Sequence, residues 1–207
     1  AGLKPNRSSD LFGFKQSNAR PDIVNTHLTS DAIMHYLDKF RFCPACGSEH
    51  FRINDNKSKH CDNCGFTYYY NSAAATVAII ENEKGELLVA RRACEPAKGT
   101  LDLIGGFVDP GERTEEAIVR EIKEETGIEV EESQLRYLFS QPNTYNYSNF
   151  IVRTTDTFFH ILIPSTTTFQ AKDDVAACWW VKKSELNTSE IGLDSVRKGT
   201  EKWLGQQ

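Results

Sequence analysis

Apolar runs separated by turn residues dominate the chain from residue 73 onward. Runs rich in β-branched and aromatic residues predict strands, at Ala75–Glu81, Leu87–Arg92, Leu135–Ser140, Phe150–Ile163 and Val175–Val181. Apolar residues at helical spacing predict two helices, at Glu115–Thr126 and Ser195–Leu204. The turn residues Glu83–Gly85 predict a hairpin between the first two strands. Strands and helices in this mixed order indicate an α/β sandwich with a mixed sheet.

The N-terminal region has a different pattern. Residues 1–33 are rich in Ser, Asn, Asp and Pro, with one apolar cluster at Leu11–Phe14, and we interpret them as a polar arm. The segment Asp31–Leu37 has the spacing of one or two helical turns. Four cysteines follow between residues 43 and 64. We therefore expect an arm at 1–33, a small cysteine module at 34–70 and the sandwich at 71–207.

Composition excludes several classes of protein. The chain has 207 residues, of which 39% are hydrophobic and 26% charged, which is enough apolar material for a packed core. No apolar run approaches the ~18 residues of a membrane span, and no secretory signal is visible at the N-terminus. The formal net charge of −5 argues against broad, non-specific nucleic-acid binding but not against a nucleotide substrate. We expect a cytoplasmic protein with no membrane and no DNA partner.

The cysteine module contains two C-x2-C pairs, Cys43 with Cys46 and Cys61 with Cys64, separated by fourteen residues. Two thiolates three positions apart can reach one ion from a tight turn, and a glycine follows each pair. Four such thiolates suit a closed, structural Zn²⁺ site. Two disulfides or four core thiols are the alternatives, and disulfides are disfavoured without a secretory signal. We interpret Cys94 and Cys178 as ordinary thiols.

Acidic residues are concentrated in one stretch, with seven of them between Asp109 and Glu125. Glycine and proline before the stretch predict a loop, Thr114 is a candidate N-cap, and Gly127 is a candidate C-terminal stop. Glu121, Glu124 and Glu125 are spaced i, i+3 and i+4, so their carboxylates share a helix face. Such a face is either simply solvated or neutralised by a hard cation such as Mg²⁺.

The stretch from Gly106 to Ile128 resembles the Nudix box, G-x5-E-x7-R-E-U-x-E-E-x-G-U, where U is aliphatic. All nine defined positions match, filled by Gly106, Glu112, Arg120, Glu121, Ile122, Glu124, Glu125, Gly127 and Ile128. The resemblance implies a Nudix α/β/α sandwich with a mixed sheet, here preceded by a small four-cysteine zinc ribbon. It also implies hydrolysis, dependent on Mg²⁺ or Mn²⁺, of a nucleoside diphosphate linked to another group.

The resemblance assigns roles by position. Glu121 and Glu125 would bind the metal, and Glu124 would bind it or help to activate water. Glu112 and Arg120 would form an orienting pair, and the backbone carbonyl of Gly105 is a further ligand candidate. A diphosphate repels nucleophiles, so neutralising its oxygens and lowering the pKa of a water molecule suits this reaction.

A four-cysteine ribbon before the box, together with Ser140-Gln141-Pro142 after it, resembles the NADH pyrophosphatase subfamily. That subfamily carries S-Q-P-W-P-F-P-x-S, of which this chain keeps Ser140, Gln141, Pro142 and Ser148, with Tyr145 in place of Phe. Asn143, Thr144 and Asn146 depart from the motif. Only 42 residues precede Cys43, so we expect the subfamily's domain before the ribbon to be missing.

The resemblance also suggests substrate contacts and a further metal ligand. Candidate contacts are Tyr69, Phe107, Gln141, Pro142, Tyr145 and Ser148, although each aromatic ring could instead belong to a core. An acidic residue followed by an aliphatic residue and, six positions on, a Trp is typical of the subfamily. Asp174 fits this register with Trp180, and Asp173 fits it with Trp179. We choose Asp174 as the downstream metal ligand.

These features predict a diphosphatase that converts NAD(H) to NMN(H) and AMP, with NAD-capped RNA ends as a possible substrate. An ADP-ribose or other ADP-linked or nucleotide-sugar pyrophosphatase is the alternative, since Pro142 is compatible with it. Hydrolysis of nucleoside triphosphates is a weaker option. A non-catalytic nucleotide-sensing or nucleic-acid-binding module is the alternative of another class. A homodimer is possible, because dimers are common in the family.

Overall fold

The computed structural model describes residues 35–147 and 150–206, without the side chains of residues 145–147. The predicted arm at 1–33 lies outside the described residues. The described part of Asp31–Leu37 is not helical, because Tyr36–Lys39 form a turn. In this turn the backbone N–H of Asp38 donates to the carbonyl of His35 over 3.0 Å.

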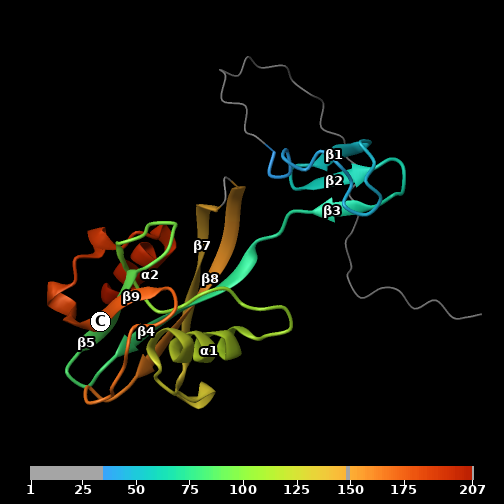
Figure 1. The fold of residues 1–207 in the computed structure, drawn as a ribbon. Helices are drawn as coiled ribbons and strands as arrows, with labels where there is room; N and C mark the ends of the chain where they lie inside the picture. Colours follow the sequence, from blue (N-terminus) through green and yellow to red (C-terminus); the bar gives the residue numbers. More distant parts are fainter. Residues whose placement is uncertain (1–34, 148–149, 207) are drawn as a thin grey trace, which may run out of the picture. The chain divides into compact units, whose positions relative to one another are not determined.

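A small antiparallel sheet carries the cysteine module (Figure 1). It consists of β1 (Phe51–Asp55), β2 (Ser58–Cys61) and β3 (Thr67–Tyr69), in the order β1-β2-β3. Phe51 and two of the cysteines, Cys43 and Cys61, form its small buried cluster, on which Phe40 packs. Such a cluster is small, so a metal ion would add substantially to the stability of this sheet.

The large sheet is mixed, as predicted. Its main path is β6-β5-β4-β8-β7, and β9 pairs with β5. β4 and β8 are parallel, and the other pairs are antiparallel. The bounds are β4 (Ala73–Glu81), β5 (Glu86–Arg92), β6 (Leu101–Asp102), β7 (Arg136–Tyr147), β8 (Phe150–Leu162) and β9 (Val175–Lys182).

Two helices cover opposite faces of this sheet (Figure 1). α1 (Thr114–Thr126) buries Ile118 and Ile122 against Ala78 and Ile80 of β4. α2 (Asp194–Leu204) buries Val196 and Trp203 against the other face. Alternate residues of β4 point to opposite faces, so one strand serves both cores. Three short 3₁₀ helices complete the described elements, at Glu132–Gln134 (η1), Lys183–Glu185 (η2) and Thr188–Glu190 (η3).

Most predicted elements are confirmed, and three details differ. The strand predicted to end at Ser140 continues to Tyr147, and this includes Pro142. β7 is an edge strand, where a residue without an N–H is tolerated. α1 begins at Thr114 and its N-cap is Arg113, so Thr114 is not the cap. The two-residue strand β6 was not predicted. The stop at Gly127 is confirmed, with a φ of 73° and a bond from its N–H to the carbonyl of Lys123.

Among the described residues, no helix is long and apolar enough to cross a membrane.

Candidate metal sites and substrate cavity

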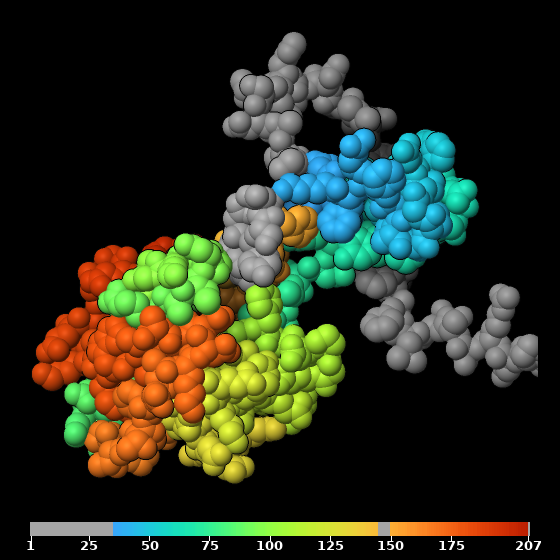
Figure 2. Space-filling view, viewed as in Figure 1, coloured from blue at the N-terminus to red at the C-terminus, as the bar shows by residue number. Residues whose placement is uncertain are grey.

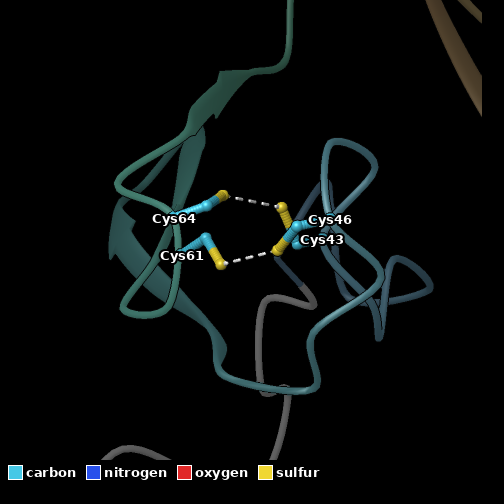
Figure 3. Close-up of side chains that lie close together, drawn as sticks. All are labelled: Cys43, Cys46, Cys61 and Cys64. Carbon is cyan, nitrogen blue, oxygen red and sulfur yellow. Dashed lines mark hydrogen bonds between the residues drawn. The ribbon is translucent and has the colours of Figure 1, made fainter.

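The four cysteines converge on one point (Figure 3). Their sulfur atoms all lie within 4.8 Å of one another, and Cys43 to Cys64 and Cys46 to Cys61 are each 3.7 Å apart. A tetrahedron with Zn–S bonds of about 2.3 Å places sulfur atoms roughly 3.8 Å apart. A disulfide requires about 2.05 Å. All four cysteines are free, so the module matches a zinc ribbon rather than a pair of disulfides.

The sulfur atoms shift one another's pKa values. A backbone hydrogen bond from Ser48, followed by the side chain of Asn63, lowers the pKa of Cys46 to about 6. A backbone hydrogen bond from Phe66 lowers the pKa of Cys64. Hydrogen bonds with the neighbouring sulfur atoms outweigh this effect and raise the pKa to about 12. One cysteine therefore ionises readily, and its negative charge opposes the ionisation of a second cysteine. A divalent cation such as Zn²⁺ would relieve the repulsion between the two thiolates.

Arg120 holds together the exposed side of the glutamate cluster on α1. Its guanidinium makes two bonds to the carboxylate of Glu112, at 2.9 and 3.0 Å. The same group contacts Glu121 at 2.8 Å and Glu124 at 3.0 Å. It also donates to the carbonyl of Phe107 over 3.0 Å. This supports the predicted pairing of Glu112 with Arg120 and extends it, because the single positive charge of Arg120 pairs with three carboxylates.

Glu125 lies on the buried side of the cluster, with 6% of its surface exposed. Burial raises the pKa of Glu125 to about 9, against a hydrogen bond of 3.1 Å from the backbone N–H of Gly105. Glu121, Asp102 and Asp174 raise it further through their charges. Burial also raises the pKa of Glu121, against the opposing effect of Arg120. Buried carboxylates among other acids suit a hard cation with oxygen ligands.

Two glycines allow the preceding loop to approach the cluster. Gly105 has a φ of 154°, and a Cβ added there would lie 2.1 Å from the carbonyl oxygen of Thr76. A Cβ on Gly106 would lie 2.4 Å from a carboxylate oxygen of Glu121. Gly105 meets backbone and must be glycine, whereas a side chain at Gly106 would push the carboxylate of Glu121 aside.

Asp174, the predicted downstream acid, lies just before β9 and near the glutamates of α1. The backbone N–H of Ala93 donates to the carbonyl of Asp174 over 2.8 Å, and the thiol of Cys94 donates to its carboxylate over 3.1 Å. In Figure 2 the green segment after β5 lies against the orange segment before β9. Asp174 raises the pKa of Glu125, whereas Asp173 raises that of Glu121. Of the two, Asp174 alone lines the cavity described next.

A cavity of about 300 Å³ opens beside Glu125, at the lower end of the range for small-molecule sites. Four of the predicted site residues line it, namely Gly105, Phe107, Glu125 and Asp174. Glu112, Arg120, Glu121 and Glu124 do not line it. Within the described residues, the four cysteines are the only His, Cys, Asp or Glu side chains that cluster within ion-binding distance. The glutamates therefore lie near one another without converging on a single point.

The predicted substrate contacts are less well gathered. Tyr69 is in the small sheet, 47% exposed, and does not line the cavity. Gln141 and Pro142 lie in β7, also outside the lining. The side chain of Tyr145 and the whole of Ser148 fall outside the described residues. These five assignments stay predictions, and only Phe107 among the described contacts lines the cavity.

The family comparison agrees with this arrangement. A family model for the NUDIX domain matches residues 71–204. The chain belongs to the Nudix family. Its Nudix domain is similar to proteins named NAD-capped RNA hydrolase NudC, for example 33% identical over 116 residues to that of Chromobacterium violaceum and 33% over 117 residues to that of Vibrio parahaemolyticus. These matches cover 56% of this chain in both cases, and 42% and 44% of the relatives.

Solved structures share the Nudix fold. A NUDIX hydrolase from Nitrosomonas europaea aligns with a TM-score of 0.60 at 19% identity, over 81% of this chain and 92% of that one. A bifunctional NMN adenylyltransferase/ADP ribose pyrophosphatase from Francisella tularensis aligns with a TM-score of 0.54 at 21% identity, over 67% and 43%. The predicted Nudix sandwich is therefore confirmed.

The Nudix cavity also contains residues that the sequence did not reveal as functional. They are polar or charged residues of the strands and nearby loops, namely Thr76, Arg92, Glu95, Asp102, Asn143, Thr154 and Asp156. Arg92 forms an ion pair with the buried carboxylate of Asp102. A polar residue inside an apolar strand was the available signal at Thr76, Asp102 and Asp156. Asn143 was visible only as a departure from the subfamily motif.

Proposed function

We propose that the chain hydrolyses the diphosphate bond of NAD(H), giving NMN(H) and AMP, with Mg²⁺ or Mn²⁺ at the α1 acids and Zn²⁺ in the ribbon. The observation that carries this proposal is the buried carboxylate of Glu125, bonded to Gly105 and facing a cavity lined by a second acid, Asp174. The names of the NudC relatives support the choice of NAD-linked substrates, including NAD-capped RNA.

The residues present fit the predicted catalytic cation. Glu121, Glu124, Glu125, Asp174 and the carbonyl of Gly105 offer oxygen atoms only, which Mg²⁺ and Mn²⁺ prefer. When bound, the cation would neutralise diphosphate oxygens and lower the pKa of a water molecule. On binding this ion, Glu121 and Glu124 would give up some of their contacts with Arg120. The four thiolates of the ribbon suit Zn²⁺ instead, because soft ligands select it.

The reaction needs one bond formed and one broken. Water oxygen forms a bond to one phosphorus, the bridging P–O bond breaks, and the water proton is lost as two monophosphates form. We assign the role of accepting that proton to Glu124, which is exposed, and Arg120, which pairs with Glu124 and Glu121, would orient both. The cavity walls position the rest of the substrate, which is the main source of catalysis in phosphoryl chemistry.

ADP-ribose is the second candidate substrate. Half of the NADH pyrophosphatase motif is replaced, and one of the replaced residues, Asn143, lines the cavity. A cavity wall that differs from that of the subfamily favours a substrate in which a group other than the nicotinamide nucleoside is linked to ADP. A possible homodimer and a cytoplasmic location stay predictions.

A substrate panel tests the proposal. The purified chain is incubated with Mg²⁺ or Mn²⁺ and NADH, NAD⁺, ADP-ribose, diadenosine polyphosphates or nucleoside triphosphates, and products are separated by chromatography. NMNH with AMP supports the first candidate, and ribose 5-phosphate with AMP supports the second. Pyrophosphate release from triphosphates would contradict both, and no turnover of any substrate would favour a nucleotide-sensing role.

Glu125→Gln is the matched inactive variant for this panel. We expect turnover to fall by at least about 100-fold, because the substitution removes one anionic ligand. The neutral, isosteric amide should leave the fold intact. Glu129→Gln, on an exposed residue beyond the end of α1 that pairs with Lys123, is the control and should keep normal turnover. Near-normal turnover of Glu125→Gln would contradict the ligand assignment.

A further inference from the structure

One buried polar side chain of the Nudix domain has no use in the proposed reaction. The hydroxyl of Thr76 in β4 makes no hydrogen bond with any described residue, although Thr76 is only 1% exposed. Buried polar groups of folded proteins are nearly always hydrogen-bonded, because an unpartnered one lowers stability. The unpartnered hydroxyl of Thr76 therefore requires a specific explanation.

The side chain of Thr76 lies on the α1 face of the large sheet. Successive side chains of a strand alternate between the two faces. Ala78 and Ile80, which follow Thr76 at two-residue spacing, belong to the core under α1, whereas Val77 belongs to the core under α2. The hydroxyl of Thr76 is therefore available to groups on α1 and not to a ligand on the α2 face of the sheet.

Gly106 is the residue directly opposite Thr76. The backbone N–H of Thr76 donates to the carbonyl of Gly106 over 2.8 Å, and the adjoining antiparallel bridge joins Ala75 to Phe107. Side chains of directly opposed residues share a face, with Cβ atoms about 4.5–5.5 Å apart. The place that a side chain would take at Gly106 is therefore next to the side chain of Thr76.

The carboxylate of Glu121 fills that place. A Cβ on Gly106 would lie 2.4 and 2.9 Å from its two oxygens, so the carboxylate lies over the glycine and beside Thr76. The Glu121 side chain is 13% exposed. One oxygen accepts a hydrogen bond from Arg120 over 2.8 Å, and the other accepts none from the described residues. A buried donor without an acceptor thus neighbours a largely buried acceptor with spare capacity.

Arg120 is the group that now orients Glu121, and it is shared with Glu112 and Glu124. In the proposed function Glu121 gives up some of this contact to bind a cation. Carboxylates that bind metals are usually hydrogen-bonded themselves, and these outer partners fix their orientation. Thr76 offers such a donor from β4, a central strand of the large sheet.

We propose that Thr76 is a positioning residue for the metal site: its hydroxyl donates to the carboxylate of Glu121 when that carboxylate binds the catalytic cation. The inference rests on the proposed function, because it requires a cation at the α1 acids. Without the cation the hydroxyl is unpartnered and lowers stability. The hydroxyl of Thr76 therefore contributes to metal affinity and not to the stability of the metal-free fold.

Binding of Mn²⁺ alone tests this role. The full chain, loaded with zinc, is titrated with Mn²⁺ by calorimetry without substrate, and it is unfolded by urea without Mn²⁺. Thr76→Val replaces the hydroxyl by a methyl group of similar size. We expect Mn²⁺ to bind about tenfold more weakly, as when outer hydrogen-bond partners are lost at other metal sites. The urea midpoint of the metal-free variant should stay equal or rise, because an unpartnered hydroxyl is removed.

Two further variants separate the hydroxyl from packing. Thr76→Ser keeps the hydroxyl and loses a methyl group, so it should retain most of the Mn²⁺ affinity while the urea midpoint falls. Thr157→Val is the matched control, because Thr157 pairs with Thr76 from β8, at the edge of β4 that Gly106 does not occupy. It should leave the Mn²⁺ affinity unchanged. Equal weakening of Mn²⁺ binding by Thr76→Val and Thr76→Ser would assign the effect to packing and overturn the inference.

The outcomes also separate this inference from the proposed function. Glu125→Gln removes a proposed ligand and shows whether Mn²⁺ binds at the α1 acids. Mn²⁺ binding that Glu125→Gln weakens and Thr76→Val leaves unchanged would overturn the role of Thr76 alone. Mn²⁺ binding that both variants weaken, in a chain that hydrolyses no substrate of the panel, would support this role and contradict the proposed reaction. Mn²⁺ binding that is absent, or that Glu125→Gln leaves unchanged, would overturn both.

Discussion

The four cysteines of the ribbon and the acids of α1 form two candidate metal sites that differ in how completely the chain assembles them. The cysteine sulfur atoms already lie within 4.8 Å of one another. The glutamates instead pair with Arg120 or point into the cavity, and Glu125 is buried with a raised pKa. One site is closed and consists of sulfur, whereas the other is open and consists of oxygen.

The difference follows from charge and chain geometry. Each cysteine pair lies in one tight turn, closed by bonds from Gly47 to the carbonyl of Cys43 and from Gly65 to that of Cys61. Protonated thiols can approach one another without strong repulsion, whereas like-charged carboxylates cannot. Arg120 supplies the positive charge that the acids need. The comparison suggests that the ribbon needs its ion for stability and that the α1 site needs one for chemistry.

Removal of the ribbon's ion should have the largest effect. We expect Cys61→Ser to abolish zinc binding, which metal analysis of the wild type should show at about one ion per chain. Backbone amides of β1–β3 should then exchange hydrogen at least about 100-fold faster, because the cluster around Phe51 is too small to hold that sheet. Amides of β4 and β8 should be unaffected.

Cys178→Ser is the control for this experiment, because Cys178 lies outside the cysteine cluster. It should retain zinc and normal exchange in β1–β3. Unchanged exchange in Cys61→Ser, after loss of the ion, would show that the ribbon does not depend on metal and would remove the contrast between the two sites.

Loss of Arg120 should have a smaller effect that depends on the added cation. We expect Arg120→Gln to lower the free energy of unfolding by about 1–3 kcal/mol without Mg²⁺, because the partly buried carboxylates of Glu112 and Glu121 lose their counter-charge. Mg²⁺ should restore part of this loss, as measured by denaturant titration with and without the ion. Arg113→Gln, which affects only exposed pairs, should cost under about 1 kcal/mol. An equal response of both variants to Mg²⁺ would contradict the arrangement.

The last prediction concerns pH. The pKa of Glu125 rises from 4.5 to about 9 on folding without metal. Between these values the folded state holds one more proton than the unfolded state, so the free energy of unfolding of the metal-free chain falls as pH rises. The affinity for Mg²⁺ should rise over the same window, because the ion competes with the proton. Calorimetric titration from pH 6 to pH 9 checks this; a flat affinity would contradict it, and Glu125→Gln should flatten the stability profile.

Much of the fold and the residues of both candidate metal sites were predicted from local sequence. The strands, α1 and its end at Gly127 came from short-range patterns, which act within a few residues. The N-cap at Arg113 and the extension of β7 through Pro142 did not, because they depend on partners distant in the chain. The predicted contacts Gln141 and Pro142 were placed by motif position and lie outside the cavity lining.

By itself the sequence determined the Nudix helix, its acids and the two cysteine pairs, because each depends on spacings within one turn or one helix. The tertiary structure decided what surrounds them. It placed Asp174, the residue before β9, close enough to Glu125 of α1 to raise its pKa. It also brought Asn143, Asp156 and Thr76 from three strands to the lining of one cavity. Pairing of strands β4, β7 and β8 creates that juxtaposition, and no local spacing along the chain records which strands will pair.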